Sequence, residues 1–187
     1  MTFLRILAGL LAFLALTACA PPAPSAQPDE VARLAAAIQA LGPDVDPAEA
    51  HRAAFISLTY PAELARQYQI TDPPLIHNTK VNMGLRPRGL CWHWAEDMER
   101  RLKSERFETL EIHRAIANYG HPVLIEHSTS IISARGDDMF SGIVVDPWRR
   151  GGPLTWNATQ KDPKYTWVPQ REVLLDKQRN RALQAAE

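Results

Sequence analysis

The chain has 187 residues, and its 21 Lys and Arg are balanced by 21 Asp and Glu, so the formal net charge is zero. A neutral chain lacks the excess of positive charge that is typical of nucleic-acid-binding proteins, and we expect no nucleic-acid partner. The length is sufficient for one domain with a substantial hydrophobic core.

The first segment, MTFLRILAGLLAFLALTAC, predicts a signal peptide over residues 1–18. Arg5 provides the positive charge, and an apolar run too short for a comfortable membrane span follows it. The LTAC sequence that ends at Cys19 resembles the lipobox of bacterial lipoproteins. That resemblance implies that Cys19 carries lipid and anchors the mature chain to a membrane. The alternative is an ordinary secretory signal in which Cys19 is incidental.

The residue after Cys19 is Ala20 rather than Asp, and by resemblance to lipoprotein sorting rules this favours the outer membrane, with the protein facing the periplasm. Pro, Ala and Ser dominate the residues that follow, so residues 19–28 are expected to form a flexible tether. A single folded domain is expected over residues 29–187.

Helical spacing of apolar residues, together with start and stop signals, indicates several helices. Asp46 is suited to cap the second of these, and Pro47 to occupy its first position. The prolines at 73 and 74 predict a turn, and residues 75–88 are expected to be irregular. The predicted helices span residues 29–41, 47–60, 61–69, 90–107 and 170–184.

After residue 107 the period of the apolar residues changes from that of a helix to that of a strand. Strands are expected over residues 109–117, 123–134 and 142–148, and a turn-rich link at 135–142 predicts a hairpin between the last two. Trp156 and Trp167 indicate further strand or loop packing. The order of elements predicts an α+β fold in which helices pack on an antiparallel sheet.

Three residues with matching chemistry lie at element ends. Cys91 opens a predicted helix, His127 lies near the start of a strand, and Asp146 ends the next strand. A thiol becomes a good nucleophile as the thiolate, which a helix N-terminus and an imidazolium both favour. A carboxylate on the far nitrogen of the imidazole orients the ring. Cys91, His127 and Asp146 are therefore the candidate nucleophile, base and orienting acid.

The sequences GLCWHWA, EH and VVDPW, at residues 89–95, 126–127 and 144–148, resemble the core of the transglutaminase-like superfamily. The resemblance implies a papain-like fold with a Cys-His-Asp site. It covers a little under half of the chain. Ser128 and Thr129 differ from the residues that are common after the family's histidine. This difference leaves the Cys-His-Asp set intact, but no substrate can be assigned by analogy with the family. The superfamily contains peptidases, amidases, transglutaminases and inactive members, so the fold alone does not name a reaction.

An oxyanion intermediate would need a hydrogen-bond donor beside Cys91. The backbone amide of Cys91 is one candidate, because amides at a helix start are unpaired. Asn82, ranked ahead of Asn78, and the indole of Trp92 are the side-chain candidates for this donor and for the cleft.

Other interpretations of Cys91 remain open at this point. It could be a buried apolar filler, because free cysteine is often buried. A metal site is disfavoured, because Cys91, His93 and a remote histidine would be a forced ligand set, and no metal or cofactor is expected. On a helix His93 should point away from Cys91, to the surface or a supporting position. For His113, Trp94 and Trp148 structural packing is expected, whereas Trp92 and Trp156 are candidates to line a cleft.

The favoured function is an envelope lipoprotein that cleaves or transfers amide bonds of a peptide, protein or peptidoglycan through a thioester acyl-enzyme. Two alternatives remain. The first is a non-catalytic lipoprotein that uses the same fold to bind a protein or cell-wall partner. The second is an envelope structural or assembly factor in which the likeness of Cys91, His127 and Asp146 to a catalytic triad is a coincidence.

Overall fold

The structure is a computed structural model that describes residues 27–185, in which five helices accompany a five-stranded antiparallel sheet. The predicted signal peptide, Cys19 and nearly all of the predicted tether lie outside the described residues. Helix α2 (Pro28–Gln39) begins one residue earlier than predicted. None of the helices in the described region has the length and apolarity needed to cross a membrane.

Helix α3 (Pro47–Gln67) starts as predicted, with the carboxylate of Asp46 accepting a hydrogen bond from the amide of Glu49 at 2.8 Å. The prediction of two separate helices on either side of residue 60 was wrong, because α3 continues through Pro61. Proline removes one helical hydrogen bond and normally ends or kinks a helix. Here Pro61 is buried along with Leu64, and the apolar packing of that face keeps the two halves continuous.

The prediction of an irregular segment over 75–88 was also wrong in its first half, where helix α4 (Pro74–Asn82) lies. Pro74 stands at the first helical position, which tolerates proline because the amide there has no helical partner. His77 is the one buried residue of this helix. An apolar stripe is therefore absent from α4, and periodicity could not reveal it.

Helix α5 (Cys91–Lys103) occupies the first two thirds of the helix predicted over 90–107. Its buried face includes Trp94, Met98 and Leu102, which belong to the main hydrophobic core. The hydroxyl of Ser130, on the central strand of the sheet, donates to the carbonyl of Ala95 at 2.8 Å and ties α5 to the sheet.

The strands lie in the order β4-β3-β2-β1-β5, and every pair is antiparallel. Their bounds are β1 Leu110–Ala117, β2 His127–Ala134, β3 Ile143–Asp146, β4 Thr155–Ala158 and β5 Val168–Pro169. Short 3-10 turns η1 (Met139–Ser141), η2 (Trp148–Arg150) and η3 (Thr159–Lys161) link them, and α6 (Gln170–Gln184) follows. The strand predicted from residue 123 starts only at His127; the apolar side chains of residues 123–125 are exposed.

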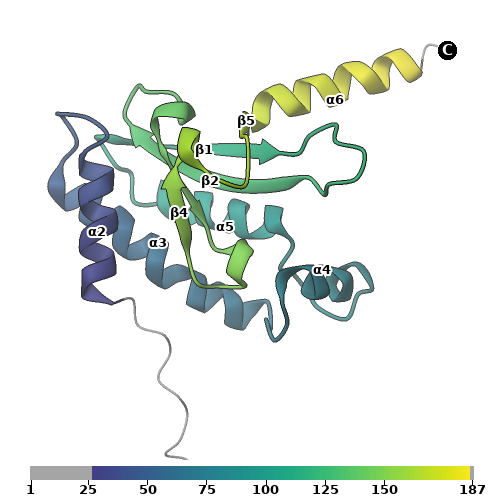
Figure 1. The fold of residues 1–187 in the computed structure, drawn as a ribbon, viewed down its shortest axis with the longest axis horizontal. Helices are drawn as coiled ribbons and strands as arrows, with labels where there is room; N and C mark the ends of the chain where they lie inside the picture. The colour runs from purple at the N-terminus through teal and green to yellow at the C-terminus, as the bar shows by residue number, and fades with distance from the viewer. Residues whose placement is uncertain (1–26, 186–187) are drawn as a thin grey trace, which may run out of the picture.

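Helices α3 and α5 lie on one side of the sheet, while α6 extends away from it at the C-terminal end (Figure 1). The β1–β2 register pairs Ala117 with His127, so His127 stands at the end of the sheet where β1 finishes. Asp146 ends β3, which pairs antiparallel with β2, so it comes to the same end. The α+β prediction is confirmed, and the fold brings one end of β2, one end of β3 and the start of α5 together.

Candidate active site

The chain enters α5 through a glycine that no other residue could replace without strain. Gly89 has φ +125°, and a Cβ at this position would lie 2.4 Å from Nε2 of His77. The carbonyl of Gly89 accepts a hydrogen bond from the indole of Trp94 at 3.0 Å, and Nε2 of His77 bonds the carbonyl of Arg88 at 2.9 Å. The backbone just before Cys91 is therefore fixed on both sides.

His93 completes this helix start. Its Nδ1 accepts hydrogen bonds from the amides of Gly89 and Leu90, both at 3.1 Å. Burial, and then the positive charge of Arg88, lower the pKa of His93, which suits a neutral ring that accepts at Nδ1. The ring does not face solvent, because His93 is buried beside the N-terminus of α5, where it caps the helix.

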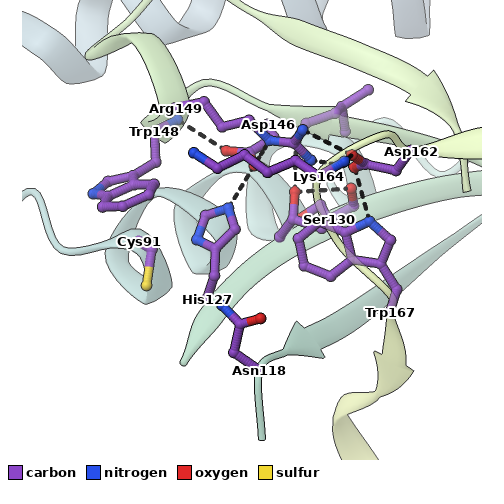
Figure 2. A network of polar contacts seen from close by, with 12 residues as sticks. Cys91, Asn118, His127, Ser130, Asp146, Trp148, Arg149, Asp162, Lys164 and Trp167 are labelled. Carbon is purple, nitrogen blue, oxygen red and sulfur yellow. Dashed lines mark hydrogen bonds and ion pairs between the residues drawn. The ribbon is translucent and has the colours of Figure 1, made fainter. Parts of the chain in front are cut away.

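His127 and Asp146 are in direct contact. Nε2 of His127 donates to Oδ2 of Asp146 at 2.5 Å, and both side chains are almost fully buried. The amide of Trp148 donates to the other oxygen, Oδ1, at 3.1 Å. The carboxylate thereby fixes both the orientation of the ring and the nitrogen that carries the proton. Figure 2 shows the ring of His127 between Asp146 and Cys91.

The second ring nitrogen of His127, Nδ1, is buried and has no hydrogen-bond partner in the described part of the chain. The thiol of Cys91 donates instead to the backbone carbonyl of Glu126, at 3.7 Å. Burial lowers the pKa of His127, but the charge and hydrogen bond of Asp146, together with nearby Cys91, outweigh it and raise the pKa to about 9. The surroundings of His127 therefore favour the protonated form of its ring.

Aromatic rings enclose His127. Its ring centroid lies 4.6 Å from those of Trp148 and Tyr165 and 5.4 Å from that of Trp167. The predicted core position of Trp148 is confirmed by its burial. These rings exclude water from the contact between His127 and Asp146, which strengthens the electrostatic interaction.

The candidate donors for an oxyanion are distributed unevenly around the site. Oδ1 of Asn78 accepts from the indole of Trp148 at 3.2 Å, so Asn78 is connected to the site through a ring that touches His127. Asn82 is exposed at the end of α4. Trp92 is 46% exposed, and its ring lies against that of His93, with centroids 3.8 Å apart. Trp156, the other cleft candidate, is partly buried and packs against the core.

Two charged residues that sequence reasoning missed complete the site. Nε of Arg149 donates to Oδ2 of Asp146 at 2.7 Å, and its two terminal nitrogens bind both oxygens of Asp162. Asp162 also accepts from the indole of Trp167 at 3.0 Å. Arg149 follows Asp146 by three residues in the DPWRR sequence, which was an available signal; nothing near Asp162 in the sequence indicated its role.

The loop between β1 and β2 contacts the sulfur of Cys91. Cys91 is only 8% exposed, and the carbonyl that its thiol contacts belongs to Glu126, the last residue of this loop. The loop is held by Asn118, which donates to the carbonyl of Ile125 at 3.0 Å, and by Lys177 of α6, whose ammonium lies 2.5 Å from the carboxylate of Glu126.

Comparison of the chain with protein-family models, curated proteins and solved structures finds no match. Within residues 27–185, no group of three or more His, Cys, Asp or Glu side chains is arranged to hold a metal ion. The geometry of Cys91, His127 and Asp146 is therefore the basis for any statement about function.

Proposed function

We propose that this protein is a cysteine hydrolase or acyltransferase of the papain-like, transglutaminase-like type that acts on amide bonds. One observation carries the proposal: His127 is buried and hydrogen-bonded to Asp146 at 2.5 Å, and its Nδ1, on the side of Cys91, has no hydrogen-bond partner among residues 27–185. Cys91 is the first residue of α5 and so lies at the positive end of the helix.

The raised pKa of His127, about 9, supports a mechanism in which the ring is an imidazolium when catalysis begins. In this mechanism the sulfur of Cys91 reacts as the thiolate, which is the nucleophilic form of a cysteine. The sulfur of Cys91 attacks the amide carbonyl, and the electron pair of the C=O bond moves to oxygen. When this intermediate collapses, the C–N bond breaks, and Nδ1 of His127 delivers its proton to the leaving nitrogen. A thioester to Cys91 remains. Water or an amine then attacks the thioester and gives its proton to His127. The second tetrahedral intermediate collapses, the C–S bond breaks with its electron pair returning to the sulfur of Cys91, and the acid or new amide leaves, which restores the starting state.

The oxyanion of each tetrahedral intermediate needs donors close to the sulfur. The amide of Cys91 is suited to this role, because the first residues of a helix have no carbonyl partner within it. The amides of His93 and Trp94 are already engaged by the carbonyl of Leu90, at 2.9 and 3.3 Å. A side-chain donor would come from Asn78 or Trp92 more readily than from Asn82, since Asn78 contacts Trp148 and Trp92 adjoins Cys91.

The same proposal includes a location. The lipobox resemblance at residues 16–19 supports a lipid anchor on Cys19, and Ala20 supports the outer membrane, facing the periplasm. Peptides, proteins and peptidoglycan are the amide-bearing polymers of that compartment, and they are the proposed substrates.

The proposal is tested with the full chain in detergent and an electrophilic peptide probe that forms a covalent bond with active thiolates. Peptide mapping by mass spectrometry locates the adduct, which distinguishes Cys91 from Cys19. We expect rapid labelling of Cys91 and a fall of about 100-fold or more in His127→Ala. His113→Ala is the matched control, because His113 hydrogen-bonds Ser133 at 2.8 Å and should leave labelling unchanged. Equal labelling of Cys91 in the native protein and His127→Ala would overturn the proposal.

One observation favours the non-catalytic alternative, in which the fold binds a protein or cell-wall partner: Cys91 is only 8% exposed, and its thiol donates to the backbone carbonyl of Glu126. Isolated sacculi and envelope proteins distinguish the two functions. Release of fragments that stops in Cys91→Ala supports catalysis, whereas retention of a partner by both the native protein and Cys91→Ala, without any cleavage, supports binding.

A further inference from the structure

The carboxylate that contacts His127 is shared with a second cation. Oδ2 of Asp146 accepts from Nε2 of His127 at 2.5 Å and from Nε of Arg149 at 2.7 Å. Both side chains therefore share one oxygen atom of Asp146. A carboxylate shared in this way is drawn towards whichever cation is less well compensated elsewhere, so the second partner of Arg149 affects how Asp146 faces His127.

That second partner is Asp162. Its two oxygens bind the two terminal nitrogens of Arg149, and its side chain is fully buried, as is nearly all of the side chain of Arg149. Hydrogen bonds from the indole of Trp167 and the amide of Lys164, both at 3.0 Å, hold the carboxylate of Asp162 in place. Arg149 therefore bridges two carboxylates, each of which is fixed by further donors.

The residues that follow Asp162 also contact His127. The rings of Tyr165 and Trp167 lie 4.6 and 5.4 Å from the ring of His127, and the guanidinium of Arg149 lies 4.7 Å from the ring of Tyr165. The segment 162–167 therefore packs against the imidazole and against the cation that competes with it for Asp146 (Figure 2).

We infer that Arg149 and Asp162 are positioning residues for the candidate active site, and that Asp162 neutralises Arg149 so that Asp146 stays directed at His127. Charges alternate along the chain of contacts from His127 to Asp146, Arg149 and Asp162. Without Asp162, Arg149 would draw Asp146 away and its positive charge would repel the imidazolium. That Arg149 and Asp162 assist catalysis rests on the proposed function, whereas their effect on the pKa of His127 does not.

The direct test is NMR titration of the His127 ring in the full-length protein. The titratable and charged groups that face this ring are Cys91 of α5, Asp146 of β3, Arg149 of η2 and Tyr165 of the segment before β5. In Asp162→Asn the positive charge of Arg149 is no longer offset. We expect the pKa of His127 to fall from about 9 towards the ordinary value of about 6.5.

A purely structural role for Asp162 would lower the melting temperature and leave the titration of His127 unchanged, and that result would overturn the inference. Glu49→Gln is the matched control. Glu49 is a buried carboxylate that holds the backbone of Glu108 and Thr109 at 2.7 and 2.8 Å. We expect this variant to lose stability without any change in the titration of His127.

If Asp162→Asn does not fold, the double variant R149M/D162N removes both charges together. We then expect the pKa of His127 to rise above its native value. Loss of the positive charge of Arg149, which shares Oδ2 of Asp146 with His127, raises this pKa, whereas loss of the negative charge of the more distant Asp162 lowers it by less. An unchanged pKa in the double variant would overturn the inference.

The results distinguish this inference from the proposed function. If the pKa of His127 responds as expected but the labelling of Cys91 does not depend on His127, the proposed function fails and the positioning role of Arg149 and Asp162 stands. If the labelling of Cys91 depends on His127 but the pKa of His127 does not change in the variants, the positioning role fails and the proposed function stands.

Discussion

The stability of the protein should depend on the ionisation of His127 in a defined direction. Burial opposes the charged ring, but Asp146 and Cys91 raise the pKa to about 9 in the folded protein, against about 6.5 in an unfolded chain. Folding therefore favours the protonated ring. The resulting stabilisation is fully present below pH 6.5 and is lost as the pH rises through 9. The difference between the two values corresponds to about 3 kcal/mol.

The perturbation is His127→Gln, which keeps a polar side chain but removes the charge. Free energies of unfolding from urea titrations at a series of pH values between 5.5 and 10 give the difference between the native protein and the variant. We expect this difference to be largest at the acidic end and to shrink by about 3 kcal/mol by the alkaline end. His113→Gln controls for the loss of a histidine from the sheet.

The contribution of Cys91 can be separated in the same assay. Cys91→Ala removes one of the groups that raise the pKa of His127, so the pH-dependent difference should become smaller in that background while the part due to Asp146 remains. A difference between native protein and His127→Gln that stays constant over the whole pH range, or that grows as the pH rises, would refute the interpretation of His127 as a buried imidazolium.

Three further substitutions test how the frame around the site is built. Gly89→Ala places a Cβ only 2.4 Å from Nε2 of His77 at a backbone φ of +125°, which strains the folded state. We expect the free energy of unfolding, measured by thermal denaturation, to fall by at least about 2 kcal/mol. Glu49→Gln weakens buried hydrogen bonds from two backbone amides, and we expect a loss of about 1–3 kcal/mol in urea unfolding. Ser130→Ala removes one bond to the carbonyl of Ala95, and a loss near 1 kcal/mol is expected; a loss larger than that of Gly89→Ala would contradict this ranking.

Elements whose signal is local were predictable from the sequence. The start of α5 follows from the glycine and proline before Cys91 and from the helical spacing after it. The strands containing His127 and Asp146 follow from short runs rich in apolar and β-branched residues. The end of β3 is also local, because Asp146 precedes a proline. From these three signals the sequence placed Cys91, His127 and Asp146 on the helix and strands that carry them in the structure.

Elements that depend on packing were not predictable in the same way. Helix α4 buries little besides His77, so it has no apolar stripe, and α3 passes through Pro61 because neighbouring apolar residues bury that face. His93 was expected to point away from Cys91, to the surface or to a supporting position, and the spacing did not decide between the two. Its ring turns back instead to the two amides that precede the helix. Capping of this kind depends on a side-chain rotamer, which spacing along the chain does not specify.

The sequence by itself determined the residue types, their order and the elements that carry them, because backbone preferences and apolar periodicity act over a few neighbouring residues. Only the tertiary structure decided how Asp146 is shared. The contact of Arg149 with Asp162 joins residues 13 positions apart, with β4 and η3 between them. The rings of Tyr165 and Trp167 reach His127 from a segment nearly 40 residues away along the chain. Such contacts depend on how whole strands and loops pack, and their electrostatic effect appears only when burial removes the water between them.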